Sequence, residues 1–206
     1  VYLGLVLVIL RVFGVQTVSA AAAIASLGVT AGLALQGSLA NFAGGVLILL
    51  LHPFRVGDYI VEDTHANEGT VIEITVFYTK LKSFDNKIII IPNGTLANTS
   101  MTNVTHADIR MINLSVGISY EDDIRKAKDL LMRLVKEEPR ALDTQPYQVF
   151  VSDLAASSVK LGLRFWVSTG DYWNVHWSML EKIKLTFDEE GISIPFQQLD
   201  VHMDRS

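Results

Sequence analysis

The sequence predicts a membrane protein that combines an apolar helical segment with a soluble α+β part. The first observation is the distribution of charge along the 206 residues: no charged side chain lies between Arg11 and Arg55, and all 22 acidic residues follow Arg55. The second is the spacing of apolar residues, which after Arg55 changes between a strand-like period of two and a helical period of about 3.6. We therefore expect the first quarter of the chain to lie in a membrane and the rest in water.

The composition excludes several classes of protein. The chain has no cysteine, which excludes disulfides, cysteine metal ligands and a cysteine nucleophile. A net charge of -5 argues against a nucleic-acid-binding protein, which normally presents a basic surface. The histidines show no metal-ligand spacing; they are His52, His65, His106, His176 and His202. The chain also lacks a phosphate-binding loop and a nucleophile elbow, so we expect no enzyme, no catalytic residue, no cofactor and no metal.

The apolar quarter is too long for a secretory signal and lacks its basic start. Residues 1–14 are expected to be the end of a preceding transmembrane helix, because their apolar run is shorter than the roughly 20 residues that span a bilayer. The native protein is thus expected to extend further toward the N-terminus. Residues 15–52 are predicted to form a complete transmembrane helix with a break at Gln36-Gly37, where glycine permits a kink. The second piece is expected to turn away from the direction of the first. It is expected to end at His52-Pro53, because the residue before a proline disfavours helix.

Small residues dominate the first half of this predicted helix, and small residues let helices approach closely within a membrane. At about 100° per residue they form two stripes. One stripe is a shallow groove of Ala25, Gly28 and Gly32, and the other is a ridge of Ala22, Ser26 and Thr30. Val29 and Leu33 lie between the stripes. The alternative is a tightly packed helix of an ordinary bundle, in which Val29 and Leu33 are core residues.

This layout suits a ring of identical helices, in which the ridge of one copy enters the groove of the next. Such a heterologous contact closes into a cycle when the rotation allows it. The face between the stripes then points at the ring axis, so Val29 and Leu33 are predicted to form two apolar rings about 6 Å apart along a pore. Apolar rings in a narrow pore expel water and block ions.

The soluble part is predicted to contain two domains. Residues 53–104 are expected to form an all-β domain, because four short segments are rich in β-branched and aromatic residues: Tyr59–Val61, Gly69–Thr75, Thr79–Phe84 and Lys87–Pro92. Turns are predicted at Asp85-Asn86 and at Asn93-Gly94.

Residues 105–195 follow the split βαβ pattern, which ends on a final strand. Its earlier elements are predicted at Ile109–Ser119 (strand), Asp122–Lys136 (helix), Gln148–Ser152 and Ser158–Val167 (strands) and a second helix that ends near Glu190. Asp171 is expected to cap the second helix and Gly191 to stop it.

Several short motifs carry a resemblance to a known family. In chain order they are Gly32–Asn41, Pro53–Tyr59, Gly69–Val71, Ile89–Gly94 and Gly191–Pro195. Together, in this order and over almost the whole chain, they resemble the small-conductance mechanosensitive channels, the MscS family. Four positions depart from the family pattern: Val29 stands where leucine is frequent, Ser26 and Thr30 where alanine is frequent, and Ala25 where glycine is frequent.

The resemblance implies a homoheptamer with three transmembrane helices per subunit, opened by bilayer tension on hypo-osmotic shock. The implied fold is a kinked pore-lining transmembrane helix, an Sm-like β domain, a ferredoxin-like α/β vestibule domain and, at residues 196–206, a strand of a C-terminal β-barrel shared by all subunits. The family's two apolar rings map onto Val29 and Leu33, and its kink maps onto Gly37. The implied partners are permeating ions, small solutes and membrane lipids, with no nucleic acid.

The implied location is a bacterial-type cytoplasmic (inner) membrane, crossed several times, with the C-terminal part in the cytoplasm. Arg55, just past the apolar helix, agrees with that side because basic residues favour the cytoplasmic end of a span. We further expect Asn41 to couple the pore helix to the β domain near Asn93 and Gly94.

A second function remains open from the sequence alone. The chain could be a membrane-anchored oligomeric binding module, with an Sm-like domain that binds a ligand or RNA. The acidic net charge and the lack of an aromatic and basic strand motif argue against RNA binding. A simple membrane anchor also has no need of stripes of glycine and alanine.

Overall fold

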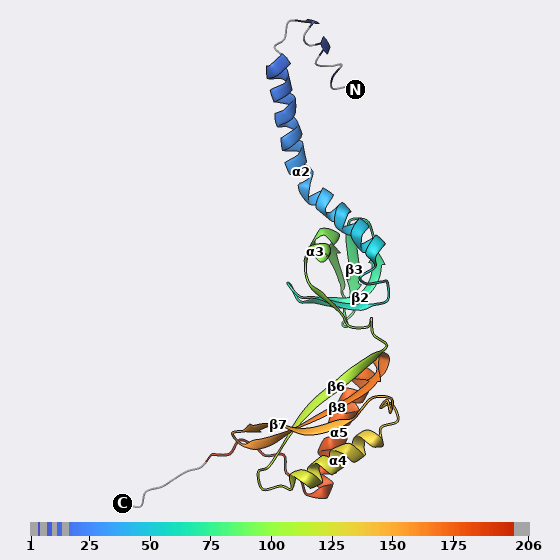
Figure 1. Cartoon of the computed structure of the whole chain (residues 1–206), viewed down its shortest axis with the longest axis vertical. Coiled ribbons are helices and arrows are strands. Elements are labelled where there is room, and N and C mark those ends of the chain that lie inside the picture. The colour runs from blue at the N-terminus through green and yellow to red at the C-terminus, as the bar shows by residue number, and fades with distance from the viewer. Residues whose placement is uncertain (1–3, 5–7, 10–11, 14–16, 200–206) are drawn as a thin grey trace, which may run out of the picture. The chain divides into compact units, whose positions relative to one another are not determined.

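The computed structural model describes residues 4, 8–9, 12–13 and 17–199 (Figure 1). It divides into two compact units, Val1–His106 and Ala107–Ser206, and each is described here by itself. The predicted end of a preceding transmembrane helix at residues 1–14 lies mostly outside the described residues, as do residues 200–206 of the predicted barrel strand.

The first unit begins with helix α2, Thr17–Leu51, which is 35 residues long. Within the described residues it is the helix whose length and composition suffice to cross a membrane, with a mean hydropathy of 1.9 over an 18-residue window within Val18–Leu51. It is continuous through Gln36-Gly37, so the predicted break is wrong as an interruption of the helix. Figure 1 shows instead that α2 changes direction near the middle of its length. The helix ends before His52-Pro53 as predicted, with His52 at a φ of 48°.

A five-stranded antiparallel sheet follows, in the order β4-β3-β2-β1-β5. Its strands are β1 (Tyr59–Glu62), β2 (Asn67–Ile74), β3 (Tyr78–Lys82), β4 (Ile88–Pro92) and β5 (Met101–Asn103). The predicted turn at Asp85-Asn86 joins β3 to β4, with Asn86 in the left-handed region at a φ of 68°. The core of this unit includes Ile48 of α2, packed with apolar residues of the sheet and of the short helix α3, Asn93–Asn98.

Two details of the first unit differ from the sequence predictions. The turn predicted at Asn93-Gly94 is wrong, because these residues begin helix α3. Pro92 precedes them with a φ of -60°, a value that its ring fixes and that suits a helix start. The short strand β5 was not predicted, since three residues without apolar alternation give no strand signal.

The second unit is a three-stranded antiparallel sheet, in the order β6-β8-β7, with two helices. Its elements are β6 (Ile109–Ile118), α4 (Ile124–Lys136), β7 (Gln148–Ala155), β8 (Ser158–Ser168), the 3-10 turn η1 (Thr169–Asp171) and α5 (Tyr172–Glu190). Alternate residues of β8 from Val159 to Val167 are buried in one core together with residues of β6, α4 and α5. Because alternate residues share a face of a sheet, both helices cover the same face.

The helix ends of the second unit also refine the predictions. Helix α4 begins two residues after the predicted start at Asp122, and Asp123 caps it: its carboxylate accepts from the backbone N–H groups of Arg125 and Lys126. Asp171 does not cap α5 with its side chain, because it already has helical backbone angles as the last residue of η1. Gly191 stops α5 as predicted, at a φ of 73°.

The final strand of the split βαβ pattern is absent from the described residues, since Ile192–Leu199 have no regular structure. The backbone N–H of Ser119 donates to the carbonyl of Ser193 (3.0 Å) where this strand would begin. Pro195, two residues later, has no N–H with which to continue a ladder. The order strand–helix–strand–strand–helix is confirmed, and the sixth element is not.

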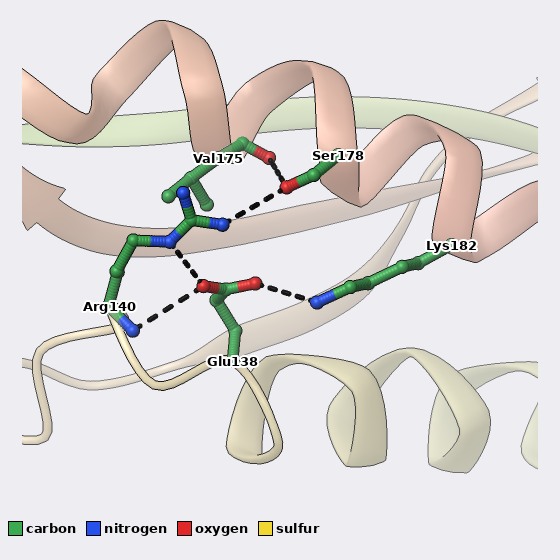
Figure 2. Close-up of polar contacts among 5 residues, drawn as sticks. All are labelled: Glu138, Arg140, Val175, Ser178 and Lys182. Carbon is green, nitrogen blue, oxygen red and sulfur yellow. Dashed lines mark hydrogen bonds and ion pairs between the residues drawn. The ribbon is translucent and has the colours of Figure 1, made fainter.

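A buried carboxylate ties the loop after α4 to α5 (Figure 2). Glu138 is 2% exposed, and it accepts from Nε of Arg140 (2.7 Å) and from Nζ of Lys182 (2.8 Å). Nη2 of Arg140 also donates to Oγ of Ser178 (3.3 Å), a second residue of α5. Burial alone would raise the pKa of Glu138, but the two cationic donors outweigh it and lower the pKa to about 2. The carboxylate is therefore ionised at neutral pH.

Candidate functional site

The first half of α2 presents the predicted pore and packing residues on its surface. All six residues of the groove and ridge are exposed in the single chain: Ala22, Ala25, Ser26, Gly28, Thr30 and Gly32. Val29 and Leu33 are 64% and 67% exposed. A Cβ atom built on Gly28 or Gly32 meets nothing within 4 Å in the described part of the chain. Nothing in that part of the chain therefore requires glycine at these two positions.

The two hydroxyl groups of the ridge are bonded within their own helix. Oγ of Ser26 donates to the carbonyl of Ala23 (2.8 Å), and Oγ1 of Thr30 donates to the carbonyl of Ser26 (2.9 Å). Such back-bonding satisfies the donor of a helical serine or threonine without a partner from another helix. The ridge therefore stays small and has no unmatched donor, although two of its three positions depart from alanine.

The second half of α2 lies against the sheet by a narrow stripe. Asn41, Gly44, Gly45 and Ile48 follow each other at helical spacing, and the last three are buried while the remaining residues of this half are exposed. A Cβ on Gly44 would lie 2.5 Å from the carbonyl oxygen of Asn93, and a Cβ on Gly45 would lie 1.9 Å from the carbonyl oxygen of Val76. Helix backbone thus rests on the backbone of α3 and of the turn between β2 and β3, and only glycine allows that approach.

The structure brings two of the three predicted coupling residues together. The backbone N–H of Gly94 donates to Oδ1 of Asn41 (3.0 Å). A Cβ on Gly94 would lie 2.7 Å from that same oxygen, so this glycine also lets the two segments approach. The side chain of Asn93 lies beneath the helix at Gly45 but does not bond to Asn41: its Nδ2 donates to the carbonyl of Thr75 (2.8 Å), and its Oδ1 accepts from Thr79 (2.8 Å).

Sequence reasoning missed Gly44 and Gly45 as contact residues. The signal was present: small or polar residues at positions 41, 44 and 45 form one stripe of a helix that is otherwise apolar. No group of three metal-ligating side chains comes together among the described residues. The arrangement is that of an apolar helix with one half fixed to the β domain and the other half without a partner among the residues that the structure describes.

Comparisons with known proteins agree with this arrangement. The family models described as "Mechanosensitive ion channel, beta-domain" and "Mechanosensitive ion channel MscS, C-terminal" match residues 37–106 and 112–194. An uncharacterized MscS family protein of Buchnera aphidicola subsp. Baizongia pistaciae is 40% identical over 190 residues, which are 92% of this chain and 67% of that protein. The small-conductance mechanosensitive channel of Helicobacter pylori is 30% identical over 196 residues, which are 95% of this chain and 71% of that protein.

A solved structure is similar over nearly the whole chain. The crystal structure of Helicobacter pylori MscS in its closed state superposes with a TM-score of 0.90 at 29% identity, covering 97% of this chain and 79% of that one. These matches define the class of protein as a membrane ion channel. The chain belongs to the MscS family of mechanosensitive ion channels. It spans about two thirds of the length of the curated relatives it matches.

Proposed function

We propose that this chain is the subunit of a homoheptameric channel that opens under membrane tension and releases ions and small solutes on hypo-osmotic shock. The observation that carries the proposal is a difference between the two halves of α2 in what their small residues contact. The first half exposes small residues that nothing in the described part of the chain packs against, whereas the second half needs its glycines to lie on α3 and on the turn between β2 and β3. A helix built in this way can pack against copies of itself at one end and move a soluble domain at the other.

The length of the first half fits the membrane. Thr17–Gln36 comprises 20 residues, which at about 1.5 Å per residue gives roughly 30 Å, the thickness of the hydrocarbon core. The second half is engaged by the sheet, so the first half is the part that crosses. We place the protein in a bacterial-type inner membrane as a multi-pass protein, with the sheet on the cytoplasmic side, where Arg55 agrees with the positive-inside preference.

The closed pore is formed by the face that carries Val29 and Leu33. The exposure of both side chains in the single chain is what a position on the axis of a ring requires. In the assembled ring the groove of one subunit receives the ridge of the next, and the two apolar rings exclude water from the constriction. The bend near the middle of α2, which we assign to Gln36 and Gly37, then turns the second half away from the axis.

Opening follows from a difference in membrane area between two states. Tension favours the open state only if that state occupies more area, because a force shifts an equilibrium only through a difference between states. Small residues at the helix contacts let neighbouring helices slide with little steric resistance. The bond between Asn41 and Gly94 and the backbone contacts of Gly44 and Gly45 then transmit the movement of the first half to the sheet.

Patch-clamp recording under stepped suction tests the proposal, with liposomes that contain the full-length protein. We expect stepwise currents that follow the applied tension and that are absent from empty liposomes. Silence up to rupture of the patch, with the folded oligomer verified in the membrane, would refute tension gating. In that case a membrane-anchored binding module becomes the better explanation.

A further inference from the structure

We propose that Thr79 of β3 is a positioning residue for the attachment of α2 to the sheet. Its hydroxyl bonds to Asn93 and not to the helix. Its hydroxyl orients the side-chain amide of Asn93, and Asn93 in turn holds the two backbone segments on which Gly44 and Gly45 rest. The consequence for gating rests on the proposed channel function, whereas the consequence for attachment does not.

Thr79 and Asn93 form a buried polar pair whose orientation is determined. Both side chains are fully buried, and Oγ1 of Thr79 lies 2.8 Å from Oδ1 of Asn93. The other end of the amide, Nδ2, lies 2.8 Å from the carbonyl oxygen of Thr75. A carbonyl can only accept, so the amide must present its nitrogen to Thr75 and its oxygen to Thr79. In this orientation the hydroxyl of Thr79 is the donor that satisfies Oδ1 of the amide.

Asn93 supports the turn between β2 and β3 at two points. Its side chain donates to the carbonyl of Thr75, and its backbone N–H donates to the carbonyl of Phe77 (2.9 Å). Val76 lies between these two carbonyls, and its own carbonyl is the group that Gly45 approaches. The carbonyl of Asn93 itself is the group that Gly44 approaches. One residue thus sets the position of both backbone surfaces under the helix.

The clearance at this contact is too small for the amide to reorient. Nδ2 of Asn93 lies only 2.7 Å from the position of a Cβ on Gly45, so the amide is directly beneath the helix. Without the hydroxyl of Thr79, Oδ1 of Asn93 is left as a buried acceptor with no donor, which is unfavourable. Any movement that brings the amide to another donor releases Thr75 or presses on α2. We therefore expect loss of this one hydroxyl to loosen the attachment of the helix.

Hydrogen exchange of the full-length protein in liposomes tests the attachment directly. Thr79→Val keeps the shape of the side chain and removes the hydroxyl, and Thr79→Ser keeps the hydroxyl. In Thr79→Val we expect exchange to be about tenfold faster at 75–78, at 93–98 and in the second half of α2. Exchange in β1 and β2 should be unchanged. Thr79→Ser should match the wild type, as should Thr102→Val, which alters an exposed threonine of the same sheet.

Two results of the exchange experiment would overturn the proposal. The first is unchanged exchange at 75–78 and 93–98 in Thr79→Val. The second is a uniform increase over the whole first unit, because that would assign to Thr79 only a general contribution to stability.

Recordings under sustained tension supply the functional readout. We expect the rates of closing and of current decline in Thr79→Val to differ from the wild type by about threefold or more, and to return to wild-type values in Thr79→Ser. Unchanged rates together with faster exchange would refute a role in gating. If the wild type itself carries no tension-dependent current, the proposed function fails, and the exchange result still decides the positioning role.

Discussion

Gly45→Ala should detach the second half of α2 from the sheet. The added Cβ would lie 1.9 Å from the carbonyl oxygen of Val76, whereas ordinary contact begins at 3.4 Å. The obstacle is backbone and cannot rotate away, so the helix must retreat by about 1.5 Å. Such a retreat stretches the 3.0 Å bond between Gly94 and Asn41 beyond hydrogen-bonding range.

The expected cost follows from three contributions. Overpacking costs about 2 kcal/mol, and the lost hydrogen bond costs about 1 kcal/mol. Alanine is a better helix former than glycine and returns about 1 kcal/mol. The net loss of about 2 kcal/mol corresponds to a shift of roughly 30-fold toward the detached helix.

Hydrogen exchange at 93–98, in the full-length protein in liposomes, measures this shift. The matched control is Ala43→Ser, which also adds one atom to α2 but on an exposed position two residues away. We expect the control to exchange like the wild type and Gly45→Ala to exchange roughly 30-fold faster. If Gly45→Ala exchanges like the control, the backbone contact does not hold the helix and the reasoning is refuted.

The remaining predictions concern the pore, the packing stripe, the coupling bond and the buried carboxylate. Leu33→Ser should let water into the constriction and give a leak current or a lower tension threshold. An unchanged leak current and threshold would contradict the assignment of Leu33 to the pore axis. Gly28→Val should fill the groove and raise the tension for opening, and an unchanged threshold would contradict the groove. Asn41→Ala should alter closing and inactivation, which recordings under sustained tension would detect, and unaltered kinetics would refute the coupling. Glu138 has a pKa of about 2 in the folded state against 4.5 in a model peptide, so its contribution to stability is full above about pH 4.5 and is lost as the pH falls toward about 2. Thermal unfolding over that range should show Glu138→Gln losing less stability on acidification than the wild type, and parallel curves would refute the assignment.

The sequence predicted the parts of the fold that depend on local signals. Asp85-Asn86 formed the expected turn, because asparagine tolerates the left-handed conformation that such a turn needs. Gly191 ended α5 for the same conformational reason, and His52-Pro53 ended α2. These signals act within a few residues and need no tertiary partner.

The features that sequence reasoning missed depend on contacts distant in the chain. Asn93-Gly94 has the composition of a turn, but Asn93 is drawn inward by Thr75 and Thr79, and the segment continues as a helix. The role of Gly45 is decided by the carbonyl of Val76, which lies 31 positions away in the sequence. A stripe of small residues in an apolar helix predicts close packing, but the stripe alone does not say against what.

The two kinds of glycine in α2 imply an order of events during biogenesis. The contacts of Gly44 and Gly45 lie wholly within one polypeptide, so this part of the subunit can reach its final form as soon as the chain leaves the ribosome and folds. No described residue of the same chain fills the space beside Gly28 and Gly32, and in the proposed ring a neighbouring subunit fills it. On the proposed assembly, each newly inserted subunit first exposes that space to lipid chains, and neighbouring subunits displace those chains as the ring closes. Lipid composition at the site of insertion would then influence the yield of assembled channels before it influences their opening.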